Sequence, residues 1–440
     1  MRRIPAVLAV WMGLGGAARA GDHWPQWRGP FLNGTTDSTG LPVEWSEEKG
    51  VKWKVPLPSW SGSTPAVWGD RIFVASPSGA GSGPPAGQGK TMARLKPEGQ
   101  DLYLLCFSRP DGKELWRTRL GGGNYQIGKQ NMSSPSPVTD GKMVWALTGT
   151  GILSGLDGEG RIVWQEDLQK KYGKFGLLWG YGASPLLWED RLIVSVQHGM
   201  HTDAPCYLAA FEPRTGKLLW RVERPTDARQ ESPDAYTTPI PMKVGDRTDL
   251  LVLGGDYLTG HDPKTGKELW RCGGFNPKNS EWWRTVSSPL PAGDLAFGCS
   301  KQGPLVAVRG GGRGVVTKTH LAWTSAEATC DVPTPVSDGK YLYVLGDQGF
   351  LSCLDPKTGK PHYLRQRLPR GTYSASPLLA EGRLYLTSER ARTTVVAAGP
   401  EFRILAENAL DDDWTLSSIA VAGSELFVRT STHLYCIGKK

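Results

Sequence analysis

After its N-terminal stretch, the sequence has no further long apolar run: no later segment is apolar over the ~20 residues that a membrane-spanning helix needs. It also has no cysteine before Cys106, so none lies near the N-terminal apolar stretch to serve as a lipid acceptor. No long segment shows the apolar period of an amphipathic helix. We therefore expect neither an integral helical membrane protein, nor a lipoprotein, nor a helical fold.

The N-terminus has the features of a secretory signal peptide. Met1-Arg2-Arg3 precedes an apolar stretch over residues 4–16, and Ala18-Arg19-Ala20 follows it. A basic start, a short apolar core and a small-residue cleavage site predict a cleaved signal peptide over residues 1–20. The protein is therefore expected to be periplasmic or secreted.

The excess of basic over acidic residues is also small. The formal net charge is +8, and loss of Arg2, Arg3 and Arg19 with the signal peptide leaves 8 − 3 = +5. Most basic residues lie one or two positions from an acidic one, as in residues 262–268, which is typical of a mixed surface rather than a basic stripe. This distribution gives no support to nucleic-acid binding.

Glycine, proline and tryptophan are abundant, with 56, 33 and 18 copies. Four short signals recur in a fixed order: a Ser-x-Pro phrase before an apolar strand, a strand rich in Ile, Val, Leu and Tyr, a third strand leading to a polar turn, and a strand containing tryptophan. Apolar strands between such turns predict four-stranded antiparallel blades of about fifty residues. The repeats begin near Ser61, Asn131, Gly182, Tyr236, Val286, Asp331, Tyr373 and Leu416. The expected fold is all-β, an eight-bladed β-propeller.

The eighth repeat ends after three strands, at Cys436. Residues 51–57, Val-Lys-Trp-Lys-Val-Pro-Leu, match the pattern of a fourth strand. Because an open sheet edge is a liability, we expect this N-terminal strand to pair into the last blade and close the ring. The predicted organisation is a leader over residues 21–50 and a propeller over residues 51–440.

The phrase at residues 262–270, Asp-Pro-Lys-Thr-Gly-Lys-Glu-Leu-Trp, resembles the tryptophan-docking motif of the pyrroloquinoline quinone (PQQ) dehydrogenases and of the exported propellers that share their repeat. Related phrases occupy residues 111–116, 212–220 and, in weaker form, 355–363, and the resemblance extends from Trp45 to the C-terminus. It implies that the tryptophans pack between neighbouring blades, where large flat apolar rings fit. The tryptophans concerned are Trp53, Trp116, Trp164, Trp220, Trp270 and Trp323.

Two absences weaken an enzymatic interpretation. The dehydrogenases that this chain resembles hold PQQ with a disulfide between adjacent cysteines, a bound calcium and a catalytic Asp. This chain has no adjacent cysteine pair and no Cys-x-x-Cys-His haem site. We expect no cofactor and no catalytic residues. A PQQ-dependent oxidoreductase with diverged cofactor ligation, using PQQ and calcium, is the alternative hypothesis.

Chain direction in such blades sends the long loops to one face, because the loop between the second and third strands and the loop between blades share it. A rigid scaffold that presents long loops commonly uses them for binding. We expect this face to bind a protein or a glycan in the cell envelope, and a role as a scaffold in outer-membrane protein assembly is a further alternative. The candidate residues on this face are Tyr125, Gln126, Trp179, Tyr181, Trp282, Trp283, Arg284, Arg390, Arg392 and Trp414.

Two other groups of residues call for an interpretation. His198, His201 and Asp203 form a weak candidate for a transition-metal site, with an ordinary polar loop as the alternative. Seven cysteines are an odd number for an exported protein, so at least one is unpaired or pairs with another chain. Cys106, Cys353 and Cys436 occupy equivalent repeat positions and are expected to be small buried core residues.

Overall fold

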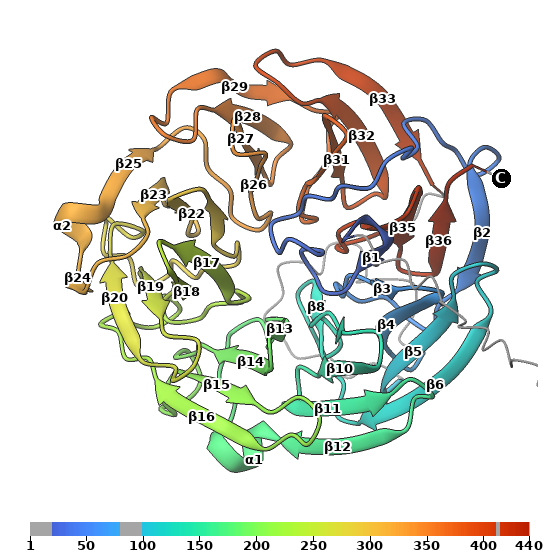
Figure 1. Cartoon of the computed structure of the whole chain (residues 1–440), viewed down its shortest axis with the longest axis horizontal. Helices are drawn as coiled ribbons and strands as arrows, with labels where there is room; N and C mark the ends of the chain where they lie inside the picture. The colour runs from blue at the N-terminus through green and yellow to red at the C-terminus, as the bar shows by residue number, and fades with distance from the viewer. Residues whose placement is uncertain (1–19, 80–98, 411–413, 440) are drawn as a thin grey trace, which may run out of the picture.

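The computed structural model describes residues 20–79, 99–410 and 414–439, so the predicted signal peptide lies almost entirely outside the described residues. The described part forms eight antiparallel sheets arranged around a central axis (Figure 1). The predicted eight-bladed propeller is confirmed. None of the described helices is long and apolar enough to cross a bilayer.

The blades are numbered in their order along the chain, and the strands of each blade are given from the axis outward. Blade 1 consists of β3 (Ala66–Trp68), β4 (Arg71–Pro77), β5 (Leu102–Ser108) and β6 (Glu114–Gly121), and blade 2 consists of β9 (Val138–Thr139), β10 (Met143–Leu147), β11 (Ile152–Asp157) and β12 (Ile162–Asp167). Blade 3 consists of β13 (Leu186–Trp188), β14 (Arg191–Val196), β15 (Tyr207–Phe211) and β16 (Leu218–Glu223), and blade 4 consists of β17 (Ile240–Val244), β18 (Arg247–Gly254), β19 (Tyr257–His261) and β20 (Glu268–Cys272).

Blade 5 consists of β21 (Leu290–Ala292), β22 (Leu295–Gly298), β23 (Leu305–Arg309) and β25 (Leu321–Ser325), and blade 6 consists of β26 (Val336–Ser337), β27 (Leu342–Gly346), β28 (Phe350–Leu354) and β29 (Pro361–Arg367). Blade 7 consists of β30 (Leu378–Ala380), β31 (Arg383–Thr387), β32 (Arg392–Ala397) and β33 (Ile404–Ala409), and blade 8 consists of β34 (Ala420–Ala422), β35 (Glu425–Arg429), β36 (His433–Ile437) and β2 (Val51–Pro56).

The short elements outside this plan are η1 (Ala20–Asp22), β1 (His23–Trp24), the hairpin β7 (Gln126–Ile127) and β8 (Gln130–Asn131), α1 (Leu168–Tyr172), β24 (Gly314–Val315) and α2 (Thr317–His320).

Burial follows position within the blade. The middle strands lie between neighbouring sheets, so β10 and β15 are buried along their whole length and their sequences are almost continuously apolar. The outer strand β2 instead alternates half-buried and exposed residues. Cys106, Cys353 and Cys436 are fully buried in middle strands, as predicted.

The ring closes where β2 pairs antiparallel with β36, with Trp53 opposite Cys436. This is the closing strand that the sequence predicts. Glu425, at the start of β35, accepts hydrogen bonds from Lys52 of β2 and from Arg109 Nε of blade 1, the latter at 2.7 Å. One carboxylate therefore joins the first blade, the last blade and the closing strand.

The Ser-x-Pro phrases close a second ring around the axis. In each blade a Ser or Thr before the inner strand accepts, on its hydroxyl oxygen, a hydrogen bond of 2.9–3.2 Å from the backbone N–H of the equivalent residue in the preceding blade. Ser418 of blade 8 donates in this way to Thr64 of blade 1. The eight residues are Thr64, Ser136, Ser184, Thr238, Ser288, Thr334, Ser376 and Ser418.

Tryptophans of the outer strands lie against the next blade. The indole N–H groups of five of them donate to a backbone carbonyl in a turn of that blade, in the pairs Trp53–Arg109, Trp116–Gly158, Trp164–Pro213, Trp220–Pro263 and Trp323–Pro356. A glycine with positive φ in the same turn faces each ring, and a Cβ at Gly160 would lie 2.5 Å from the ring of Trp116. The turn therefore requires glycine at this position.

Trp270 differs from the other five because it donates to Asp249 Oδ2 of its own blade, at 2.7 Å. In blade 5 the usual turn before the outer strand is replaced by residues 310–320, which contain β24 and α2. Trp270 still belongs to the same buried apolar cluster as Val306 and Val308 of blade 5.

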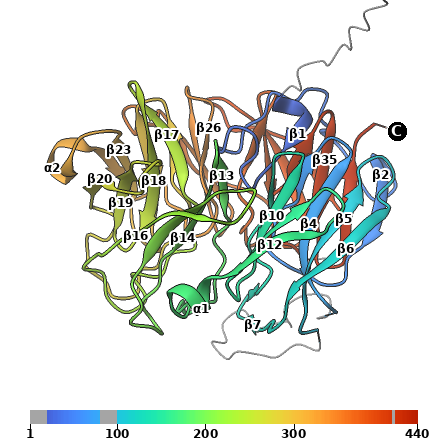
Figure 2. The same ribbon diagram turned by 60° about the horizontal axis from the view of Figure 1, so that its bottom comes forward.

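The leader crosses the short-turn end of the channel. β1 pairs with β3, and Gln26 exchanges two hydrogen bonds with the backbone of Leu187 in blade 3. Arg28 is buried and donates to the carbonyls of Pro335 and Pro377, at the inner strands of blades 6 and 7. Figure 2 shows β1 near the end of the propeller opposite to α1 and β7. The two ends of the channel therefore differ.

Candidate functional site

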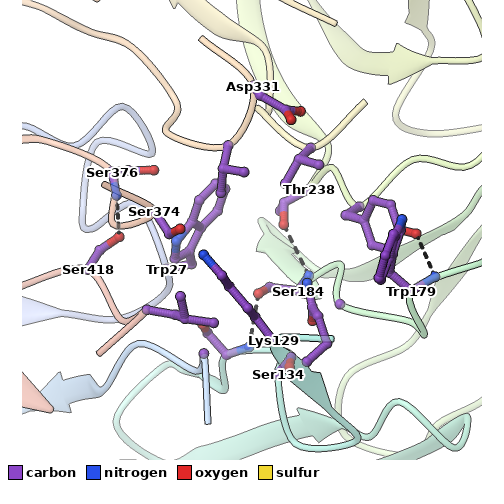
Figure 3. Close-up of a pocket in the computed structure, with 18 of the residues that line it drawn as sticks. Trp27, Lys129, Ser134, Trp179, Ser184, Thr238, Asp331, Ser374, Ser376 and Ser418 are labelled. Carbon is purple, nitrogen blue, oxygen red and sulfur yellow. Dashed lines mark hydrogen bonds between the residues drawn. The ribbon is translucent and has the colours of Figure 1, made fainter. Parts of the chain in front are cut away.

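A pocket of about 370 Å³ lies on the propeller axis (Figure 3). Its wall is built from the residues that precede the inner strand of every blade, together with Trp27 of the leader and Asp347 of the turn between β27 and β28. These inter-blade segments belong to the long-loop face, and the leader closes the opposite end, so the pocket opens toward the long loops. The lining residues that carry its chemistry are Trp27, Lys129, Trp179, Arg284, Asp331 and Asp347.

Lys129 reaches across the mouth of this pocket. It lies in the turn of the β7–β8 hairpin, between blades 1 and 2, and its Nζ lies 2.7 and 2.8 Å from the two carboxylate oxygens of Glu389 in blade 7. Ser374 Oγ also donates to Glu389, at 2.6 Å. A cation and a carboxylate 260 positions apart in the chain are thereby paired at the axis.

Arg284 occupies the wall between blades 4 and 6. One of its guanidinium nitrogens lies 3.0 Å from Asp331 Oδ2, and its Nε lies 3.8 Å from Glu231. The buried carboxylate of Glu231 also accepts from the indole N–H of Trp179 at 2.9 Å and pairs with Lys301 at 3.5 Å. Glu231 therefore holds three side chains of the pocket region in place.

Burial changes the acidity of two carboxyl groups in the wall. It raises the pKa of Asp347 to about 6, with a further contribution from the neighbouring Asp331, although hydrogen bonds from three backbone N–H groups to the Asp347 carboxylate oppose the change. Burial also raises the pKa of Asp331, against the opposing effect of Arg284 and Lys301. Both carboxyl groups therefore hold their protons to a higher pH than an exposed aspartate does.

The structure places only part of the predicted face at this pocket. Trp179 and Arg284 line it, whereas Trp282 is 50% exposed on the loop between blades 4 and 5. Arg390 is exposed in the loop between β31 and β32, and Arg392 is exposed at the start of β32.

Other predicted members of the face are structural. Tyr181 is a buried core residue whose hydroxyl donates to the carbonyl of Ser195 at 2.9 Å, so its assignment to a binding face is wrong. Gln126 and Trp283 are also buried, and Tyr125 is half-buried. The ring of Trp414 packs edge-on against Trp60, with centroids 5.3 Å apart. Gln126 and Trp283 are therefore enclosed, whereas Tyr125 and Trp414 remain partly accessible.

Sequence reasoning missed Trp27, Lys129, Asp331 and Asp347 as pocket residues. A usable signal existed for Asp331, because each residue just before an inner strand of a propeller must lie near the axis. No local signal marks Trp27 or Lys129, whose positions depend on how the leader and the β7–β8 hairpin fold back over the ring.

His198, His201 and Asp203 do not form a metal site. His198 is buried, its Nδ1 accepts from the backbone N–H of Gly176 at 3.1 Å, and burial lowers its pKa. His201 and Asp203 are exposed. Within residues 20–79, 99–410 and 414–439, no group of three or more His, Cys, Asp or Glu side chains could hold a metal ion.

The residues of the axial pocket do not fit PQQ with calcium. PQQ carries three carboxylates and would need cations that are available to it. Among the described lining residues the cations are Lys129 and Arg284, and each is already paired with a protein carboxylate. The described residues also provide no calcium-binding group of carboxylates.

Comparisons with known proteins agree with this architecture. Among solved structures, BamB from Moraxella catarrhalis is 12% identical with a TM-score of 0.59, and the alignment covers 88% of this chain and 97% of that one. Quinohemoprotein alcohol dehydrogenase from Comamonas testosteroni is 10% identical with a TM-score of 0.64, over 97% and 82%. A europium-containing methanol dehydrogenase is 10% identical with a TM-score of 0.65, over 95% and 98%. At these identities the likeness shows the fold alone.

Sequence comparison is more specific. No curated protein sequence matches the chain. A family model described as outer membrane protein assembly factor BamB matches residues 100–329 and 313–432, which is most of the propeller. The chain therefore belongs to this family of PQQ-like β-propellers.

Proposed function

We propose that this chain is a non-catalytic binding propeller of the cell envelope, which holds a protein partner on its long-loop face. The observation that carries the proposal is the asymmetry of the channel. One end is covered by the leader, which is anchored by Gln26 and Arg28, while the other opens as a pocket surrounded by the inter-blade loops of all eight blades.

The chemistry of this face favours a protein over a small anion. The described cations in the pocket wall are paired with carboxylates, so they offer no unpaired positive charge to a small anionic ligand. Around it, Trp282 and Arg390 are exposed, and Trp and Arg are enriched among the energetically dominant residues of protein interfaces. The predicted signal peptide and the description of the matching family, an outer membrane protein assembly factor, support a location in the envelope.

Site-specific crosslinking tests the proposal. A photoreactive amino acid is placed at Trp282 on the long-loop face and, as a matched control, at Val315, which is 75% exposed on β24 at the outer rim. We expect a discrete protein adduct in living cells from position 282 and none from position 315. The double variant Trp282→Ala with Arg390→Ala should lose the partner in pull-down while keeping its thermal midpoint. Equal adducts from both positions, or capture unaffected by the double variant, would refute the assignment of the face.

Two other outcomes would assign a different function. If position 282 gives no protein adduct and the purified protein binds envelope oligosaccharides, the face recognises glycans, for which Trp27 and Trp179 in the pocket would supply aromatic surfaces. If PQQ with calcium raises the thermal midpoint of the purified protein and the loaded protein reduces a dye, the oxidoreductase hypothesis replaces the binding one, because a ligand that binds only the folded state must stabilise it. We expect no such shift.

A further inference from the structure

Two buried cysteines lie side by side in blade 5. Cys299 directly follows β22, and Cys330 lies in the segment that leads from β25 to blade 6. Their Sγ atoms are 3.0 Å apart, about 1 Å more than the ~2.05 Å of a disulfide bond. Cys299 is fully buried and Cys330 is 4% exposed, in a cluster of apolar residues that includes Phe297 and Ala328.

We propose that Cys299 and Cys330 form a disulfide bond when the protein folds in an oxidising compartment. Pairing two of the seven cysteines leaves 7 − 2 = 5 thiols, which agrees with the expectation that at least one cysteine is unpaired. The remaining cysteines have other surroundings. Cys206 Sγ donates to the carbonyl of His198, and Cys353 Sγ approaches the carbonyl of Gly399 at 3.5 Å.

The oxidation is a thiol–disulfide exchange with a dithiol oxidant of the envelope, itself in the disulfide form. The thiolate of one cysteine attacks the oxidant and forms a mixed disulfide, and the thiolate of the second displaces the oxidant from it. The two cysteines lose two protons and two electrons in total. The oxidant accepts these electrons and is released in its dithiol form. The hydrogen bond to Cys299 and burial raise the pKa of the Cys330 thiol, so the exchange is expected before the blade is fully packed.

The bond would fix the segments that carry the charged wall of the axial pocket. Lys301, two residues after Cys299, pairs with Glu231, and its backbone N–H donates to the carbonyl of Arg284 at 3.0 Å. Asp331, directly after Cys330, pairs with the guanidinium of Arg284. A covalent link between positions 299 and 330 therefore ties together Lys301 and Asp331, which both bond to Arg284.

Peptide mapping tests the bond directly. Protein exported to the periplasm is denatured at harvest in the presence of an alkylating reagent, which prevents later exchange, and is then digested with trypsin without reduction. Cleavage after Arg284, Lys301, Lys318 and Lys340 places each cysteine in a peptide with no other cysteine, over residues 285–301 and 319–340. We expect these two peptides as one crosslinked species, five alkylated cysteines in the intact protein, and seven after reduction.

Cysteine variants distinguish a disulfide bond from two neighbouring free thiols. Cys299→Ser and Cys330→Ser should each leave six alkylated cysteines with or without reduction. Reductant should lower the thermal midpoint of the wild type and of the matched control Cys106→Ser, which removes another buried thiol, and should leave the Cys299→Ser, Cys330→Ser double variant unchanged. Seven alkylated cysteines in the exported, unreduced protein, or a crosslink to a different cysteine, would overturn the proposal.

Discussion

Replacing Glu425 by glutamine should weaken the junction at which the propeller closes. The side chain is 10% exposed and accepts from Lys52 and Arg109, whose side chains are 30% and 19% exposed. Glutamine keeps the shape and removes the charge, so two partly buried cations lose their counter-ion. Hydrogen bonds to charged groups contribute about 1.5–3 kcal/mol, and Arg109 keeps its bonds to two backbone carbonyls. We therefore expect a loss of about 2 kcal/mol in the free energy of unfolding.

The measurement is urea denaturation followed by tryptophan fluorescence. Glu159→Gln is the matched control, because the pair of Arg71 and Glu159 also joins two adjacent blades but its side chains are 35% and 68% exposed. An exposed pair contributes at most about 1 kcal/mol, so this variant should unfold close to the wild type. Equal losses in the two variants would show that burial of Glu425 does not matter to ring closure.

The pH dependence gives an independent check on the same carboxylate. Burial alone would raise the pKa of Glu425, but the hydrogen bonds and charges of Lys52 and Arg109 outweigh it, so the folded-state pKa lies below its ordinary value. A lowered pKa contributes stability that is present above the unfolded-state value of about 4.3 and is lost as the pH falls through the folded value. The stability difference between wild type and Glu425→Gln should therefore be full at pH 7 and shrink below about pH 4.

Three further variants test other parts of the ring by the shift of the same urea midpoint. Ser184→Ala leaves the buried N–H of Ser136 without its acceptor and should cost about 1–3 kcal/mol, whereas Ser184→Thr should not. Gly160→Ala puts a Cβ at positive φ against Trp116 and should lower the free energy of unfolding by more than about 1 kcal/mol. Wild-type stability in this variant would show that the indole of Trp116 moves aside freely. Tyr363→Phe removes a buried hydroxyl with no partner among the described residues, so stability should hold or rise, and a clear loss would reveal an unrecognised bond.

Much of the fold could be predicted because its signals are local and repeated. The Ser-x-Pro phrase, the strand after the tight turn and the tryptophan strand recur in order, so the number of blades follows from counting them. The closing strand could be predicted because the last repeat lacks its fourth strand and residues 51–57 supply the same pattern. The proposed binding face could be predicted only as a set of loops, since loop length indicates where residues gather and not which side chains point outward.

The sequence by itself determined the eight blades, their closure and the cysteines of the middle strands, because each depends on periods and residue types within about fifty positions. The tertiary structure alone decided what surrounds the axis. It pairs Lys129 with Glu389 across 260 positions, places Trp27 of the leader in the pocket wall and buries Tyr181 in the core. It also brings Cys299 to Cys330. These contacts arise where separate chain segments meet after the ring has closed, and no period in the sequence encodes the distance between them.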